Sequence, residues 1–247
     1  MVAEFVDEGI APIDMFRVEF SEDDLRALEE ALSDMKNPVE ILLFTEKSGE
    51  CLPCNETVKL LEVLREASPV VAGEKAIKVK VFDRRHDYEM FEKYGVGRVP
   101  TILLVDGVIR YLGMPAGEEV KGFVETLIRI STGDHGLSKK TVKELSEISG
   151  RIHIQVIVTP PCPYCPYAAL MANMFAFVAK VYGRGNVISE IVEAFENPDV
   201  ADMYGVTTVP TIVINRRVVF VGLPYEGQLL KAIKRLSKLP RGTNAVL

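Results

Sequence analysis

Two Cys-x-x-Cys pairs contain all four cysteines of this 247-residue chain, and they constrain its fold more than any other feature. The pairs are Cys51-Leu52-Pro53-Cys54 and Cys162-Pro163-Tyr164-Cys165. Each pair is followed by the sequence Val-Pro-Thr-Ile, so that Cys51 precedes Pro100 by 49 residues and Cys162 precedes Pro210 by 48. A dithiol and a proline that recur together at nearly the same spacing indicate an internal duplication.

The duplication extends beyond the cysteines. Residues 94–102 and 204–212 are identical at seven of nine positions. A length of 247 residues is long for one ordinary domain and sufficient for two, each with its own core. Because the stretch 131–136 is polar and contains glycine, we place the boundary there, which gives the units 1–132 and 133–247.

Hydrophobic periodicity predicts the same order of elements in both units. The apolar runs Val39–Thr45 and 152–159 end just before the two dithiols and are typical of buried strands. After each dithiol, apolar residues recur at the spacing that forms one face of a helix. Each unit is therefore expected to run strand, dithiol, helix, strand, helix, hairpin, helix, after a leading helix that begins at Ser21 or Ser138.

A hairpin is predicted after each Val-Pro. In the first unit, Asp106-Gly107 separates the apolar runs 101–105 and 108–112, which is a strong signal for a two-residue turn. In the second unit, Asn215-Arg216 is the weaker counterpart. The two units are therefore expected to end with the same hairpin and a final helix.

Composition excludes several classes of function. The chain has 29 Lys and Arg against 35 Asp and Glu, and a net charge of −6 gives no general attraction to nucleic acid or anionic lipid. The N-terminus is acidic where a secretory signal needs a basic start, and the most apolar helical segment, 168–182, is too short to span a membrane. We therefore expect a cytoplasmic protein that binds neither nucleic acid nor membrane. In that compartment paired cysteines are more often catalytic or metal-binding than structural, except in hyperthermophiles.

The predicted order of elements, with a dithiol at the start of a helix and a Val-Pro facing it, resembles the thioredoxin fold, and the second dithiol motif resembles the glutaredoxin active site. Two such units in one chain resemble the archaeal and bacterial protein disulfide oxidoreductases, the glutaredoxin-like proteins of hyperthermophiles. The resemblance implies an α/β fold with two tandem thioredoxin-like units, each a four-stranded mixed sheet flanked by helices. It also implies reduction, oxidation or isomerisation of disulfide bonds in other proteins, and it favours a thermophilic source.

Each dithiol has the parts that disulfide exchange needs, which are an attacking thiolate, a resolving thiol and access for a partner sulfur. Free N–H groups and the helix dipole at a helix N-terminus lower the pKa of a cysteine from about 8.5. Cys51 and Cys162 are therefore the expected nucleophiles, and Cys54 and Cys165, one turn further in, are the expected resolving cysteines. The residues expected to complete the active-site loops are Leu52, Pro53, Pro163 and Tyr164.

By the same resemblance, Val99-Pro100 and Val209-Pro210 are expected to have cis peptide bonds that face the dithiols, although only about 5–6% of X-Pro bonds are cis. The backbone of each valine would then be open to pair with an extended substrate chain, so these four residues are the predicted substrate-binding residues. One feature departs from the family. Many thioredoxins carry a buried acid in the strand before the dithiol, and neither 42–45 nor 156–159 contains one, so the sequence does not identify the group that exchanges a proton with the resolving cysteine.

Other uses of the cysteines fit the sequence less well. Cysteine pairs that share a zinc ion usually lie about 15–20 residues apart, whereas Cys162 lies 108 positions after Cys54. We therefore predict no metal and no bound cofactor. The expected partners are proteins with disulfides or dithiols and, by resemblance, a thioredoxin-reductase-like flavoenzyme. Two rival functions stay open, a dedicated electron carrier to a peroxidase or reductase and a client-binding chaperone module in which the dithiols are incidental.

Overall fold

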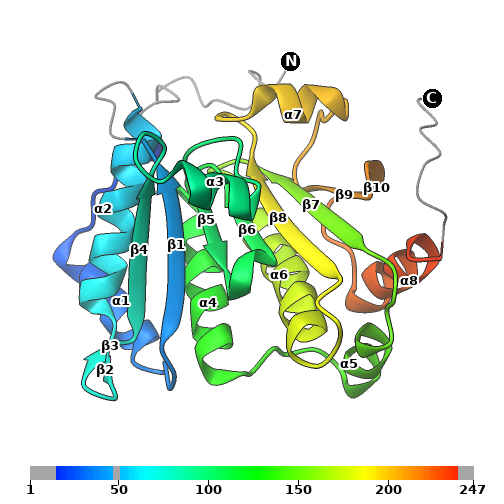
Figure 1. Ribbon diagram of the computed structural model, residues 1–247, viewed down its shortest axis with the longest axis horizontal. Coiled ribbons are helices and arrows are strands. Elements are labelled where there is room, and N and C mark those ends of the chain that lie inside the picture. The colour runs from blue at the N-terminus through cyan, green and yellow to red at the C-terminus, as the bar shows by residue number, and fades with distance from the viewer. Residues whose placement is uncertain (1–14, 47–50, 239–247) are drawn as a thin grey trace.

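Eight strands form one continuous sheet in the computed structural model, which describes residues 15–46 and 51–238 (Figure 1). In chain order the strands are β1 (Val39–Thr45), β4 (Ile77–Asp83), β5 (Thr101–Leu104), β6 (Ile109–Leu112), β7 (Ile152–Val158), β8 (Val187–Glu193), β9 (Thr211–Ile214) and β10 (Arg217–Val221). Across the sheet the order is β10-β9-β7-β8-β6-β5-β1-β4. Each unit contributes four strands with parallel and antiparallel pairs, which confirms the predicted fold class. A small separate hairpin of β2 (Val70–Val71) and β3 (Glu74–Lys75) was not predicted.

The two units are joined by strand pairing, which the sequence did not predict. Strand β6 of the first unit lies parallel to β8 of the second, and the register runs from Ile109 opposite Ser189 to Leu112 opposite Val192. The N–H of Ser189 also donates to the carbonyl oxygen of Val108 at 2.8 Å, so the backbone pairing continues beyond β6. Two four-stranded sheets therefore become a single sheet.

Helices pack on this sheet in the order that the sequence predicts. In chain order they are α1 (Glu22–Leu32), α2 (Leu52–Ala67), α3 (Tyr88–Tyr94), α4 (Glu119–Thr132), α5 (Lys139–Ser146), α6 (Cys165–Val181), α7 (Pro198–Met203) and α8 (Glu226–Leu236). Ser21 and Ser138 cap α1 and α5 through their side chains, which confirms both predicted starts. Figure 1 shows α4 between α2 and α6. Because α4 packs against α6, the last helix of the first unit contacts the dithiol helix of the second.

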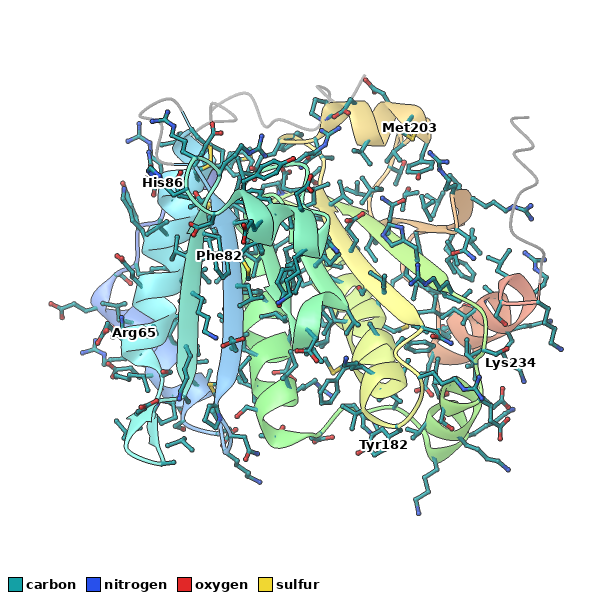
Figure 2. All side chains as sticks on the ribbon, viewed as in Figure 1. Arg65, Phe82, His86, Tyr182, Met203 and Lys234 are labelled. Atoms are coloured by element: carbon teal, nitrogen blue, oxygen red, sulfur yellow. A yellow bond between two sulfur atoms is a disulfide. The ribbon has the colours of Figure 1, made fainter. Side chains whose placement is uncertain are left out.

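The apolar core is continuous between the units. One cluster of buried side chains includes Leu61 from the first unit and Val156 and Phe175 from the second. Successive residues of a strand point to opposite faces of the sheet, and a smaller cluster covers the face that carries α3. There the ring of Phe44 lies 5.1 Å from the ring of Phe82, between centroids (Figure 2).

The turn of the first hairpin differs from the prediction, and the turn of the second agrees with it. The strong Asp106-Gly107 signal does not give a two-residue turn, because β5 ends at Leu104, a 3-10 turn spans Val105–Gly107, and β6 begins at Ile109. Val108 closes this turn, because its N–H donates to the carbonyl oxygen of Val105 at 3.2 Å. The weaker Asn215-Arg216 does form a two-residue turn, with positive φ at both residues (49° and 66°), as a type I′ turn requires.

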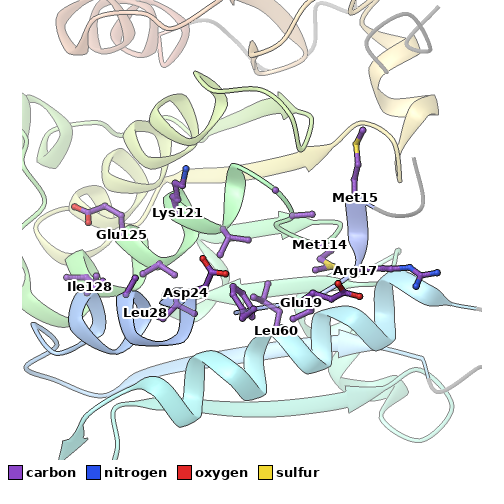
Figure 3. A pocket seen from close by; sticks show the side chains of 18 residues that line it. Met15, Arg17, Glu19, Asp24, Leu28, Leu60, Met114, Lys121, Glu125 and Ile128 are labelled. Atoms are coloured by element: carbon purple, nitrogen blue, oxygen red, sulfur yellow. The ribbon is translucent and has the colours of Figure 1, made fainter. Parts of the chain in front are cut away.

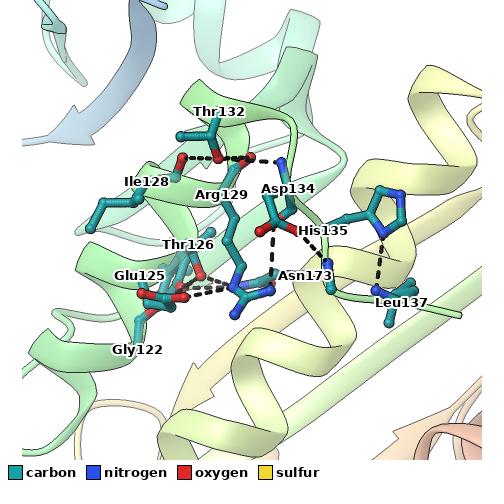
Figure 4. A network of polar contacts seen from close by, with 12 residues as sticks. Gly122, Glu125, Thr126, Ile128, Arg129, Thr132, Asp134, His135, Leu137 and Asn173 are labelled. Carbon is teal, nitrogen blue, oxygen red and sulfur yellow. Dashed lines mark hydrogen bonds and ion pairs between the residues drawn. The ribbon is translucent and has the colours of Figure 1, made fainter. Parts of the chain in front are cut away.

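A buried polar network crosses the boundary between the units. The side-chain amide of Asn173 on α6 donates to the Tyr111 hydroxyl at 2.8 Å and to the Thr126 hydroxyl at 3.2 Å, and it accepts from the Ser189 hydroxyl at 2.8 Å. Figure 4 shows the contact between Thr126 of α4 and Asn173 of α6. All four side chains are buried where water cannot reach them, so these hydrogen bonds satisfy their polar groups. The network therefore fixes α6 against α4 and β6.

We expect Asn173→Ala to destabilise the folded chain by about 2–4 kcal/mol, because the hydroxyls of Tyr111 and Ser189 lose a partner that buried groups need. Urea denaturation at neutral pH measures this free energy of unfolding. Asn55→Ala is the matched control, since Asn55 is exposed on α2. Equal stability of the two variants would mean that the network does not hold the units together.

Candidate active site

The parts of the first predicted site meet at one edge of the sheet. Phe44 of β1 pairs with Thr101 of β5, and Thr101 pairs with Leu112 of β6. One residue further on, the N–H of Gly113 donates to the carbonyl oxygen of Pro100 at 3.0 Å. The end of β1, the Val-Pro and the segment after β6 therefore lie side by side.

The second unit repeats this arrangement with equivalent residues. Ile157 of β7 pairs with Thr211 of β9, which pairs with Val221 of β10. Beyond these pairs, the N–H of Gly222 donates to the carbonyl oxygen of Pro210 at 2.7 Å. Because β1 and β7 are the strands that lead toward the dithiols, the structure brings each Val-Pro next to the strand end that precedes its own cysteines.

The first dithiol lies at the N-terminus of α2, as predicted. Cys51 is the N-cap residue, and its sulfur accepts a hydrogen bond from the N–H of Cys54 at 3.3 Å. Cys51 and Cys54 form a disulfide, with Cys54 fully buried and Cys51 partly accessible. Leu52 and Pro53 open the helix between them and are half-buried. An anion at Cys51 would therefore be stabilised by the helix N-terminus.

The second dithiol differs from the prediction in its relation to the helix. Cys162 and Cys165 form a disulfide, but α6 begins only at Cys165, with the N–H of Cys162 in a turn to the carbonyl oxygen of Thr159. The reason is Pro166, which has no N–H to donate to the carbonyl oxygen of Cys162 four residues earlier. Cys165 is fully buried and Cys162 nearly so, whereas the loop residues Pro163 and Tyr164 are exposed.

The peptide bonds Val99-Pro100 and Val209-Pro210 are both cis, which confirms that expectation. The β5 and β9 ladders begin at Thr101 and Thr211, one residue after each proline. The strand pairing therefore does not use the backbone of either valine.

The first unit closes over the loop that carries the second dithiol. The N–H of Glu118 donates to the carbonyl oxygen of Pro160 at 2.9 Å. Two glycines allow this approach. A Cβ on Gly117 would lie 2.6 Å from that same oxygen, and a Cβ on Gly122 would lie 2.9 Å from the Pro166 side chain. The start of α4 therefore packs against residues on both sides of the second Cys-x-x-Cys.

This packing buries Glu119, the first residue of α4, between the units. In the described part of the chain, neither of its carboxylate oxygens has a hydrogen-bond partner. Burial, together with the nearby charges of Glu193 and Glu118, raises its pKa to about 8. A carboxyl group of this kind holds its proton at neutral pH and is suited to proton exchange.

Two further carboxyl groups lie in the same interface. Burial raises the pKa of Glu193 to about 7 although it accepts from the N–H groups of Phe195 and Glu196. Burial also raises the pKa of Glu196, which accepts from the N–H of Met114, to about 8. Residues 42–45 and 156–159, which end the strands before the dithiols, carry no acid, as the sequence indicated, and Glu40 at the start of β1 is exposed. The three buried acids are supplied by β8, the residues after it and α4. No local pattern in the sequence marks this cluster, because these residues meet only when the units dock.

A cavity of about 540 Å³ opens between α1, α2 and α4 (Figure 3). Its wall includes Leu28, Leu60 and Val124, one from each helix, and it is mainly apolar. None of the cysteines or cis prolines lines it. Its wall also includes Met114 and Ala116, which follow β6.

Within residues 15–46 and 51–238, no group of three or more His, Cys, Asp or Glu side chains is arranged to hold a metal ion. In the same ranges, no helix is long and apolar enough to cross a membrane.

Comparison with known proteins gives one family for both units. The model of the thioredoxin domain matches residues 39–125 and again residues 152–234. Thioredoxin of Methanocaldococcus jannaschii is 36% identical over 89 residues, which cover 34% of this chain and 95% of that protein.

Solved structures extend the similarity across both units of the chain. A protein disulfide oxidoreductase from Aeropyrum pernix is 44% identical, with a TM-score of 0.88, over 91% of this chain and 97% of the other. The alkylhydroperoxide reductase AhpF of Enterococcus faecalis shares the fold at 19% identity, with a TM-score of 0.74, over 87% of this chain and 99% of that one.

Proposed function

This chain belongs to the thioredoxin family, and we propose that it is a dithiol–disulfide oxidoreductase that acts on protein disulfides at two active sites. The observation that carries the proposal is the doubled arrangement of a closed Cys-x-x-Cys disulfide beside a Val-Pro at the same sheet edge. The similarity to the Aeropyrum pernix protein disulfide oxidoreductase over nearly the full length supports it.

The two cysteines of each pair have distinct roles in the proposed reaction. In the reduced protein, the thiolate of Cys51 or Cys162 attacks a substrate disulfide and forms a mixed disulfide, and one substrate thiolate leaves. Cys54 or Cys165 then loses its proton and attacks the sulfur of the first cysteine, which releases the second substrate thiolate and closes the disulfide. The complete burial of Cys54 and Cys165 supports this assignment, because a buried thiol can reach only its own partner cysteine. The reverse sequence oxidises a substrate dithiol.

The backbone groups of Val99 and Val209, next to Pro100 and Pro210, are the proposed contacts for an extended substrate chain. Their place beside the strand end that precedes each dithiol supports this, and so does their absence from the β5 and β9 ladders. We also propose that the units are 1–132 and 133–247. A cytoplasmic location stays a prediction from the sequence.

The proposed electron donor is a thioredoxin-reductase-like flavoenzyme, since the reaction consumes a dithiol in each turnover. The rival function of a dedicated carrier predicts turnover only with a matching peroxidase or reductase. The rival function of a chaperone predicts that client binding persists when all four cysteines are serine.

Insulin reduction tests the proposed function. The chain should accelerate insulin precipitation by dithiothreitol, and alkylation of the reduced chain with iodoacetamide should remove the acceleration. A flavoenzyme with NADPH should replace dithiothreitol as the donor. Acceleration that survives alkylation would contradict the assigned chemistry.

A further inference from the structure

The two dithiol sites differ in the segment that follows the last strand of each hairpin. In the first unit this segment begins at Gly113 and in the second at Gly222, and each glycine is bonded to the proline of its own site. Both segments therefore start at the same place beside their dithiols. The exposure of the side chains after these glycines therefore determines which contacts a substrate protein can make at each site.

In the first unit the second unit covers this segment. Met114 and Ala116 are each 2% exposed. The N–H of Met114 is bonded to Glu196, and Gly117 lies against Pro160, both residues of the second unit. The side chains of Met114 and Ala116 are therefore buried, and both contribute to the wall of the cavity between α1, α2 and α4.

In the second unit the equivalent segment has no such cover. Leu223 is 42% exposed and Tyr225 is 82% exposed. We call these two side chains the C-terminal flank. The carboxylate of the next residue, Glu226, accepts hydrogen bonds from the hydroxyls of Ser138 and Thr141.

Aromatic side chains are also exposed in and just after the second Cys-x-x-Cys. Tyr164 is 64% exposed and Tyr167 is 62% exposed. At the first site, the described residues at the matching positions are Pro53, which is half-buried, and Glu56, which is buried and bonded to the N–H of Val18. Exposed tyrosines next to a reactive group are typical of surfaces that bind proteins.

We infer that the C-terminal dithiol is the site that receives extended protein segments with apolar or aromatic side chains, and that Leu223 and Tyr225 hold them. The N-terminal dithiol acts without this flank, because the second unit covers the equivalent residues. This inference rests on the proposed function and gives the C-terminal site the stronger preference for such segments. Two side chains expose far less than the about 800 Å² per partner that a stable interface buries, so the contact is transient, as turnover of a substrate requires.

The test uses the full chain with one site silenced at a time. In the Cys51→Ser/Cys54→Ser background, Leu223→Ser/Tyr225→Ser is compared with the unchanged background on insulin and on hydroxyethyl disulfide. We expect the ratio of kcat/KM for insulin to kcat/KM for the small disulfide to fall about tenfold, mainly through KM, as for the loss of an apolar contact surface. In the Cys162→Ser/Cys165→Ser background the same substitutions should not change that ratio.

Val70→Ser is the matched control, because Val70 is also exposed and apolar but lies on β2, which follows the C-terminal end of α2, whereas the first dithiol is at the N-terminus of that helix. Tyr225→Phe, which keeps the ring, should retain the ratio. An unchanged ratio in the first background, or an equal fall in both backgrounds, would overturn the inference. A fall that accompanies loss of a dimer in sedimentation would also overturn it, because the flank would then bind a second copy.

These outcomes are separate from failure of the proposed function, in which neither background would turn over insulin at all.

Discussion

A chain that carries Cys51→Ser and Cys162→Ser together should reduce insulin no faster than dithiothreitol alone. Serine cannot form the attacking thiolate, and the buried Cys54 and Cys165 cannot reach a substrate disulfide in its place. Each single variant should lose its own site and keep the turnover of the other, because each unit contains a complete dithiol and cis proline. The measurement is the rate of insulin precipitation at a fixed dithiothreitol concentration.

The matched control replaces the resolving cysteines. Cys54→Ser/Cys165→Ser should still attack the substrate but fail to release it, so mixed disulfides with insulin should accumulate on non-reducing gels. Turnover by the Cys51→Ser/Cys162→Ser chain above the uncatalysed rate would show that the nucleophiles are assigned to the wrong cysteines.

The folded chain should be less stable at pH 8 than at pH 5, by several kcal/mol. The pKa of Glu119 is raised from 4.5 to about 8 by burial, so the folded state keeps a proton that the unfolded state loses. The stabilisation is complete below about pH 4.5 and is lost as the pH rises toward the folded-state pKa. At about 1.36 kcal/mol for each pKa unit, Glu119 alone contributes at most about 5 kcal/mol to the pH-dependent part of the free energy of unfolding. Glu193 and Glu196 act in the same direction.

Glu119→Gln should remove much of this dependence, because the amide stays neutral across the range. Urea denaturation at pH 5 and at pH 8 gives the two free energies of unfolding. Glu29→Gln is the control, since Glu29 is exposed on α1 and does not act on Glu119. The same difference between pH 5 and pH 8 in the Glu119→Gln chain and in the unchanged chain would show that Glu119 is not held neutral in the folded state.

The sequence predicted most of each unit, because the signals it used are local. The apolar run Val39–Thr45 is β1 with the predicted bounds, and Ser21 caps its helix through its own side chain. The two cysteines of each pair are only three positions apart, and the cis bonds were predicted from the resemblance to the thioredoxin pattern. Local propensity, the duplicated motif and that resemblance were therefore sufficient to predict the fold class and the places of the cysteines.

The contacts between the units could not be predicted, because they depend on surfaces that no local pattern marks. Strand β6 has the composition of an ordinary hairpin strand, and only the docked structure shows that β8 lies along its other edge. Glu119 has the sequence pattern of a first-turn acid on an exposed helix, yet the approach of Pro160 buries it.

The shared sheet also sets a fixed spacing between the two disulfides. Strands β5, β6 and β8 lie between β1 and β7, so at about 4.8 Å per strand the strands that lead toward the two dithiols are about 19 Å apart. Hydrogen-bonded strands span that interval and provide no hinge, so the two cysteine pairs of one molecule cannot meet and exchange disulfides directly. An extended polypeptide covers the same distance with about six residues. A substrate whose cysteines are at least that far apart along the chain can therefore engage both sites of one molecule at once.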